Sequence, residues 1–152
     1  MSYYTSLALV LFIYMNFWFV LSLIKKRNDV ADIAWGLGFI ILTWLSFWMS
    51  DFDSGLRGVL AALLITIWGT RLSYHIYKRN KGKTEDYRYL AWREEWGKWF
   101  YLRSYLQVYI LQGILLFVIV LPVLFINKNL GPDLVLLDIF GFMVWVLGFY
   151  FE

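Results

Sequence analysis

Long apolar runs constrain this chain more than any other feature of its sequence. Five such runs, separated by short polar segments, fill most of the 152 residues. Each is long enough, as a helix, to cross the hydrocarbon core of a bilayer, which takes roughly 20 residues. Backbone polar groups in lipid must be satisfied within their own segment, so runs of this length predict helices. The expected fold class is therefore all-α, a polytopic transmembrane helical bundle of about five spans that form one membrane domain, over residues 4–24, 31–50, 56–77, 105–126 and 134–152.

Composition excludes several kinds of chemistry. Hydrophobic residues make up 61% of the chain, whereas a soluble domain usually has about 45–50% apolar residues. The chain has no cysteine and one histidine, so it offers no thiolate nucleophile, no disulfide and no multi-histidine metal site. A Rossmann fingerprint, a phosphate-binding glycine loop and a nucleophile elbow are also absent from the sequence. We therefore expect no bound metal, and no catalytic residue is identified by motif.

Positive charge is concentrated on one side of the predicted bundle. Twelve of the 14 Lys and Arg residues lie just after the first run or in and beside residues 78–103, whereas the other side has only Arg57 and Lys128. Cytoplasmic loops of membrane proteins carry such an excess. The pattern predicts that the basic loop 78–103 is cytoplasmic and that the N-terminus lies outside. Because membrane topology accounts for the basic residues, we expect no nucleic acid partner.

The second half of the basic loop has the periodicity of an interfacial helix. Aromatic residues fall at helical spacing on one face, and charged residues lie on the opposite face. We expect such a helix to lie in the plane of the membrane surface with its aromatic face against lipid, and an ordinary belt of interfacial aromatic residues is the alternative. The aromatic residues are Tyr89, Trp92, Trp96 and Trp99, and the charged residues are Glu94, Glu95 and Lys98.

Two carboxylates stand at the start of the second run. Asp29 and Asp32 are three residues apart and share one helical face. Charged residues inside a span are expensive and are functional candidates, so Asp32, together with the neighbouring Trp35, is a candidate functional residue. The alternative is that both acids form ion pairs at the membrane surface with the preceding basic residues. Two small residues would let another helix or a ligand approach closely, and these are Gly36 and Gly38.

Polar residues also mark the fourth and fifth runs. Tyr105 and Gln112 fall nearly on one helical line with Tyr101, and Tyr109 lies at its edge. They are candidates for binding a carbonyl or an amide in a cavity, or alternatively for hydrogen bonds between helices. The fifth run places small residues and acids on one face, which predicts tight packing around a polar site. These residues are Asp138, Gly141, Trp145, Gly148 and Glu152.

The arginines in and beside the basic loop have two possible ligands. Guanidinium groups bind phosphate oxygens in a bidentate way, so these residues could clamp a nucleotide phosphate. They could instead contact anionic lipid headgroups. Glu85 and Asp86 would form local ion pairs with them in either case. The arginines considered are Arg71, Arg79, Arg88 and Arg93.

Three stretches carry a family resemblance. Residues 29–39 have the sequence Asp-Val-Ala-Asp-Ile-Ala-Trp-Gly-Leu-Gly-Phe, and residues 68–76 have the sequence Trp-Gly-Thr-Arg-Leu-Ser-Tyr-His-Ile. Residues 85–93 contain Glu-Asp-Tyr-Arg-Tyr followed by Trp-Arg, and the pair at 112–113 is Gln-Gly. Together they resemble uncharacterised bacterial membrane proteins related to steroid 5-alpha-reductase. The same superfamily includes sterol reductases and isoprenylcysteine carboxyl methyltransferases.

The resemblance implies an enzyme of the bacterial plasma membrane. Its implied activity is the NADPH-dependent reduction of a carbon–carbon double bond in a lipid-like substrate, with membrane lipids as its surroundings. By position and chemistry, the residues expected to face the substrate cavity are Asp32, Trp35, Tyr105 and Gln112. Those expected on the cofactor side are Arg71, Arg88 and Arg93, with Glu85 and Asp86 orienting them.

Family members continue beyond a Phe-Glu pair similar to the one at residues 151–152, and most cofactor contacts are expected in that later part. We therefore expect this chain to be the N-terminal portion of a longer enzyme. Two alternatives remain open at the level of sequence. One is a non-catalytic membrane protein, such as a transporter subunit or a scaffold. The other is a membrane methyltransferase of the same superfamily that uses S-adenosylmethionine.

Overall fold

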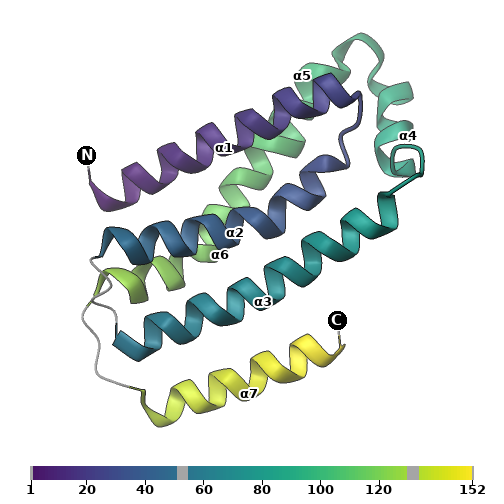
Figure 1. Ribbon diagram of the computed structural model, residues 1–152. Coiled ribbons are helices and arrows are strands. Elements are labelled where there is room, and N and C mark those ends of the chain that lie inside the picture. The colour runs from purple at the N-terminus through teal and green to yellow at the C-terminus, as the bar shows by residue number, and fades with distance from the viewer. Residues whose placement is uncertain (1, 51–54, 130–133, 152) are drawn as a thin grey trace.

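Every regular element in the described residues, 2–50, 55–129 and 134–151 of the computed structural model, is a helix. The long helices α1 (Tyr3–Lys25), α2 (Val30–Met49), α3 (Gly55–Asn80), α6 (Leu111–Lys128) and α7 (Leu136–Phe151) run side by side in alternating directions (Figure 1). Within these ranges, four segments are long and apolar enough to cross a membrane, namely α1, α2, α3 and the helical run from Tyr87 to Lys128. Helix α7 is apolar but shorter, with 16 residues. The predicted all-α fold class is confirmed.

Helix α2 occupies the centre of the bundle and packs against α1, α3 and α6. The buried core is apolar and comes mainly from α1, α2, α6 and the helical segment that leads into α6. Large apolar side chains also cover the outside, where Ile24 is 73% exposed and Phe125 is 61% exposed. In water such a surface would drive association, because it is far more extensive than the patches of soluble monomers. An apolar exterior around an apolar core is what a bundle surrounded by lipid requires.

The crossing of α2 and α3 is closest at two glycines. A Cβ atom added to Gly36 would lie 2.7 Å from the backbone oxygen of Gly69, and a Cβ added to Gly69 would lie 2.7 Å from the oxygen of Gly36. Beside this contact the Ser73 hydroxyl donates to the carbonyl of Ile33 at 3.0 Å. The prediction that Gly36 permits a close helix approach is confirmed.

The predicted basic loop is largely helical. Helix α3 continues to Asn80, three residues beyond the expected end of the span, and α4 (Tyr87–Trp96) then lies across the end of the bundle (Figure 1). A 3-10 turn (Gly97–Trp99) and α5 (Phe100–Ser104) lead into the next long helix. We call this end of the molecule the basic end, because it holds residues 25–27 and 78–103.

The aromatic face of α4 is turned toward the protein. Tyr89 and Trp96 are buried, and Trp92 stacks on Trp96 with 5.0 Å between ring centroids. Only Trp99, beyond the helix, is more than half exposed. The prediction that this face lies against lipid is therefore wrong for Tyr89 and Trp96. Helical spacing identified the aromatic face, but it did not distinguish a membrane from the end of the chain's own bundle.

A π-helical segment, η2 (Tyr105–Ile110), joins α5 to α6. The wider turn of a π-helix shifts every later side chain relative to the α-helical pattern, and such segments are often found at functional sites. Tyr105, at the start of this segment, faces α1, where its hydroxyl donates to Asn16 Oδ1 at 3.1 Å, a hydrogen bond between helices as the alternative had it. Gln112 instead lines a cavity that is described in the next section, and Tyr101 is exposed. The predicted single polar line through these residues is wrong.

Helix α7 stands at the edge of the bundle and has no buried residue in its described part. Two arginines of α3 hold its two ends. Arg57 donates to Asp138 at 2.9 Å, and Arg71 donates to the Phe149 carbonyl at 2.9 Å. Added Cβ atoms at Gly141 and Gly148 would meet no atom within 4 Å, so the predicted tight packing of this face is wrong. Residue 152 of the predicted face lies outside the described residues.

Candidate functional site

Asp32 is the centre of a polar cluster at the basic end. Its Oδ2 accepts from Arg88 Nη2 at 3.0 Å, and its Oδ1 accepts from the Tyr89 hydroxyl at 2.8 Å. Arg88 also donates from Nε to Asp86 Oδ1 at 3.0 Å, and Arg79 approaches the same carboxylate at 3.4 Å. Arg88 thus bridges two acids from two elements. The alternative prediction, that Asp32 pairs with the basic residues before it, is wrong.

A second cluster ties the α1–α2 connection to the α3–α4 connection. Arg27 makes a bidentate ion pair with the buried Asp29, at 3.0 and 2.6 Å. The buried Glu85 accepts from the backbone N–H of Asn28 at 2.5 Å and pairs with Arg93 at 3.0 Å. Asp29 therefore does pair with a preceding basic residue, as the alternative had it. These contacts join the α1–α2 connection to the α3–α4 connection, and both carboxylates are almost fully buried.

The two residues that sequence reasoning missed in this cluster are Asn28 and Ser104. The side-chain amide of Asn28 donates to the Ser104 hydroxyl at 2.8 Å, and both residues are buried. They are 76 positions apart in the chain, so no local pattern could pair them. The sequence offers only a weak signal, since Asn28 stands between Arg27 and Asp29 and Ser104 follows Arg103.

A cavity of about 450 Å³ opens between α2, α3, α4 and α6 at the first cluster. Its polar side combines the acid Asp32 with the cations Arg79 and Arg88, and Gln112 contributes a buried side-chain oxygen that accepts no hydrogen bond within the described residues. Its apolar side includes indole rings and aliphatic chains. The complete lining is Asp32, Trp35, Trp68, Leu72, Ile76, Arg79, Arg88, Gln112 and Leu115.

The cavity contains some of the predicted site residues and not others. Three of the four expected cavity residues line it, namely Asp32, Trp35 and Gln112, but Tyr105 faces α1 instead. Of the residues expected on the cofactor side, Arg88 lines the cavity and Asp86 holds Arg88 at its rim. The remaining three lie elsewhere, with Glu85 and Arg93 in the second cluster and Arg71 against α7.

An apolar cavity of about 520 Å³ adjoins the polar one. Trp68 borders both, and the second cavity continues along α6 to α7, where Trp145 and Phe149 form its far wall. A charged rim, a hydrogen-bonding middle and an apolar extension therefore follow one another along α3. This order suits an amphipathic ligand with one polar end.

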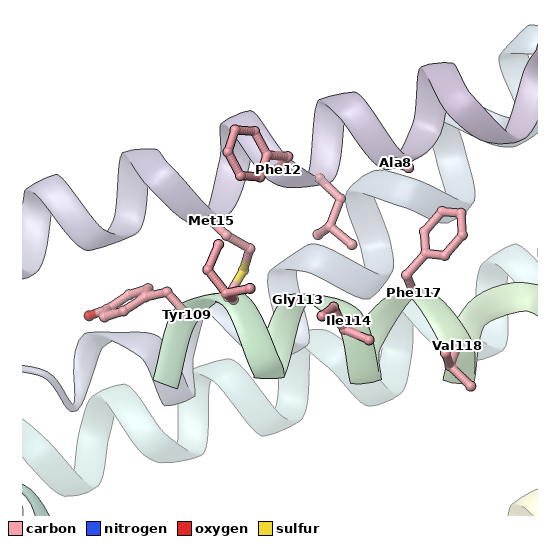
Figure 2. A pocket seen from close by; sticks show the side chains of 10 residues that line it. Ala8, Phe12, Met15, Tyr109, Gly113, Ile114, Phe117 and Val118 are labelled. Carbon is pink, nitrogen blue, oxygen red and sulfur yellow. The ribbon is translucent and has the colours of Figure 1, made fainter. Parts of the chain in front are cut away.

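A further apolar pocket of about 230 Å³ lies on the opposite side of the bundle, between α1 and α6. Figure 2 shows the side chain of Met15 of α1 reaching toward α6 near Gly113, and the hydroxyl of Tyr109 points away from them. The lining holds no charged group. It can accommodate hydrocarbon but supplies no residue for chemistry.

Asp86 gives the basic end a defined response to acid. Its side chain accepts from the backbone N–H of Arg88 at 3.1 Å and so caps α4. The hydrogen bond from the Arg88 side chain lowers the pKa of the Asp86 carboxyl below its ordinary value. A carboxyl with a lowered pKa contributes its full stabilisation above the unfolded-state pKa and loses it as the pH falls through the folded-state pKa.

We therefore expect the wild-type chain to lose stability from about pH 4 downward, and Asp86→Asn to lose less over the same range. Asparagine keeps the helix cap but has no charge to lose. Thermal unfolding in detergent at a series of pH values measures the difference. Equal pH dependence of the two proteins would contradict this role of the Asp86 carboxylate.

Comparisons with known proteins identify a family and no activity. A family model described as a protein of unknown function (DUF1295) matches residues 18–152, which include every predicted site residue. An uncharacterised protein of Schizosaccharomyces pombe is 29% identical over 120 residues, which cover 75% of this chain and 35% of that protein. The chain therefore spans about a third of the length of this curated relative. No solved structure matches the chain.

Proposed function

Because the chain belongs to the DUF1295 family, whose function is unknown, we propose its activity from its cavity and from its likeness to steroid 5-alpha-reductases. The proposed activity is NADPH-dependent reduction of a carbon–carbon double bond in a lipid-like substrate, with this chain forming the substrate side of the enzyme. The observation that carries the proposal is the polar cavity of about 450 Å³ that continues into an apolar one. Soluble enzymes for polar metabolites have little use for such an extension.

The rim of the polar cavity has groups that fit one phosphate of a nucleotide. The side chains of Arg79 and Arg88 are 44% and 46% exposed even though each is paired with a carboxylate. A guanidinium in this position keeps N–H donors for phosphate oxygens. Arg79 and Arg88 would hold the phosphate, and the cofactor would supply the hydride. Arg71 and Arg93 lie outside the cavity and have no part in this proposal.

The other residues of the cavity have roles that follow from their contacts. The Asp32 carboxylate accepts hydrogen bonds from the Arg88 guanidinium and the Tyr89 hydroxyl. It therefore holds Arg88 in position at the rim of the cavity. Gln112 can donate to a carbonyl oxygen or accept from a hydroxyl on the polar end of the substrate. Trp35 and Trp68 form flat apolar walls, and the adjoining cavity holds the hydrocarbon part of the substrate.

The proposal places the protein in a bacterial plasma membrane. The apolar helices would span the bilayer, with the basic end in the cytoplasm and the N-terminus outside. NADPH is a cytoplasmic cofactor in this scheme and would reach the rim from that side. The hydrocarbon substrate would come from the membrane lipids that surround the bundle.

NADPH binding to the chain in lipid nanodiscs tests the cofactor part of this proposal. We expect Arg88→Ala to weaken binding about tenfold, because it removes one charge-assisted phosphate contact. Arg103→Ala is the matched control, since Arg103 is an exposed arginine of the same end that packs over Trp96 and does not line the cavity. Thermal unfolding of each variant separates lost binding from lost folding.

Two results would contradict the proposal. Equal affinity in Arg88→Ala and Arg103→Ala would remove Arg88 from the cofactor site. An absence of saturable NADPH binding in the wild-type chain and also in a longer family member would favour a non-catalytic membrane protein. Binding of S-adenosylmethionine in place of NADPH would favour the methyltransferase alternative.

A further inference from the structure

A small polar pocket of about 130 Å³ lies at the basic end, lined in part by Arg27 and Asp29 of the second cluster. It is formed where the last turn of α1 and the last turn of α3 meet the start of α2. Lys25, Arg27 and Lys81 supply three positive charges to its lining, and Asp29 supplies one negative charge. The proposed reductase chemistry uses none of these residues.

The negative charge in the lining is already engaged. Asp29 receives two hydrogen bonds from Arg27 and one from the backbone N–H of Asp86 at 3.3 Å. Arg27 in turn also donates to the carbonyl of Lys83 at 2.8 Å. Arg27 and Asp29 therefore neutralise each other and build the pocket wall. The surplus charge of the pocket comes from Lys25 and Lys81.

Two cations of this pocket have no partner among the described residues. Neither Lys25 nor Lys81 forms an ion pair there, and both lysines are exposed. The side-chain nitrogen of Asn80 is buried without a hydrogen bond, while Arg79 donates to the amide oxygen of the same residue at 3.1 Å. The described residues therefore provide no acceptor for the two ammonium groups, and the lining of the pocket carries a surplus of positive charge.

The local backbone holds the pocket in this form. Gly82 has a φ angle of 75°, which turns the chain after α3 and leaves Lys81 beside the pocket. Tyr77, one helical turn before Lys81, is half exposed and also lines the pocket. Exposed tyrosines and lysines at the end of an apolar helix are typical of the boundary between hydrocarbon and headgroups.

We propose that this pocket binds the phosphate group of an anionic membrane phospholipid. Two lysines that line a small hollow match one phosphate, and basic pockets between membrane helices on the cytoplasmic side are known to hold lipid headgroups. The acyl chains would lie along the apolar outer surfaces of α1 and α3. Bound lipid would join the ends of α1 and α3 at the base of α2, next to the contacts of Glu85 and Asp29.

Native mass spectrometry of the chain released from nanodiscs tests the proposal. One set of nanodiscs contains phosphatidylcholine alone, and the other contains phosphatidylglycerol as well. We expect the wild-type chain to retain one phosphatidylglycerol in preference to phosphatidylcholine. Lys25→Gln with Lys81→Gln should reduce that retention at least about tenfold, since each lysine near a membrane surface contributes about 1 kcal/mol.

The control is the double variant Lys78→Gln with Lys98→Gln, which removes the same charge from two exposed lysines that do not line the pocket. Equal loss of lipid in both double variants would overturn the proposal, because the attraction would then be general. Displacement of the lipid by millimolar inorganic phosphate would assign the pocket to free phosphate instead. Arg88→Ala should leave lipid retention unchanged, which keeps this test separate from that of the proposed reductase.

Discussion

Glu85→Ala is expected to destabilise the protein by about 3 kcal/mol, because removal of one partner of a buried ion pair leaves the other charge without compensation. The Glu85 side chain is only 5% exposed and is the acceptor for both Arg93 and the backbone N–H of Asn28. Its loss would separate the α1–α2 connection from α4. We expect a lower unfolding temperature in detergent and faster trypsin cleavage at residues 78–88.

Two variants calibrate this result. Glu94→Ala removes the same type of side chain from an exposed position of α4, and surface changes of this kind usually alter stability by less than about 0.5 kcal/mol. Glu85→Gln keeps the size of the side chain and one acceptor, so its effect should be intermediate. A wild-type unfolding temperature in Glu85→Ala would show that the cluster does not hold the two connections together.

Gly36→Ala is expected to destabilise the bundle by about 2 kcal/mol, because overpacking a tight contact costs about 1–3 kcal/mol. The added Cβ would lie 2.7 Å from the backbone oxygen of Gly69 and would also meet the Ser73 hydroxyl. A backbone atom in the middle of a helix cannot rotate away, so α2 and α3 would have to separate. Thermal unfolding and the loss of NADPH binding should both report this, since α2 and α3 form two walls of the polar cavity.

Gly141→Ala is the matched control for Gly36→Ala. Gly141 also lies inside an apolar helix, but a Cβ there would meet no atom within 4 Å. Alanine favours a helix over glycine by about 1 kcal/mol, so this variant should be neutral or slightly more stable than wild type. Equal destabilisation by both changes would mean that the effect comes from the helix and not from the crossing.

Helices were predictable from the sequence because a bilayer imposes a length, and four of the predicted spans meet it in the described residues, whereas α7 has 16 residues. The close approach at Gly36 was predictable for a similar reason, since only a small residue permits it. The direction of a helical face was less predictable. Trp96 and Tyr89 have the spacing of a lipid-facing stripe, yet they cover the end of the bundle. Hydrophobicity alone does not distinguish lipid from protein interior.

The sequence predicts that polar residues of the spans line a cavity, but it does not predict the complete set of residues that do so. Asp32, Trp35 and Gln112 were selected because polar groups in a span need a partner, and all three line one cavity. Tyr105 was misplaced because an α-helical period was assumed across residues that form a π-helix. Glu85 and Arg93 were grouped with Arg88 by proximity in sequence, although a single turn of helix is enough to point them at different neighbours.

The position of α7 affects how a ligand would be concentrated. This helix is fastened by Arg57 and Arg71 at its two ends and forms one wall of the apolar cavity between them. A hydrocarbon ligand that enters beside such a wall leaves the bilayer directly and never crosses water. Its effective concentration is then the one in the membrane, and transfer from water into the membrane is favourable by about 0.8 kcal/mol for each methylene group. Few specific contacts are needed under these conditions, so selectivity can come from the polar end alone.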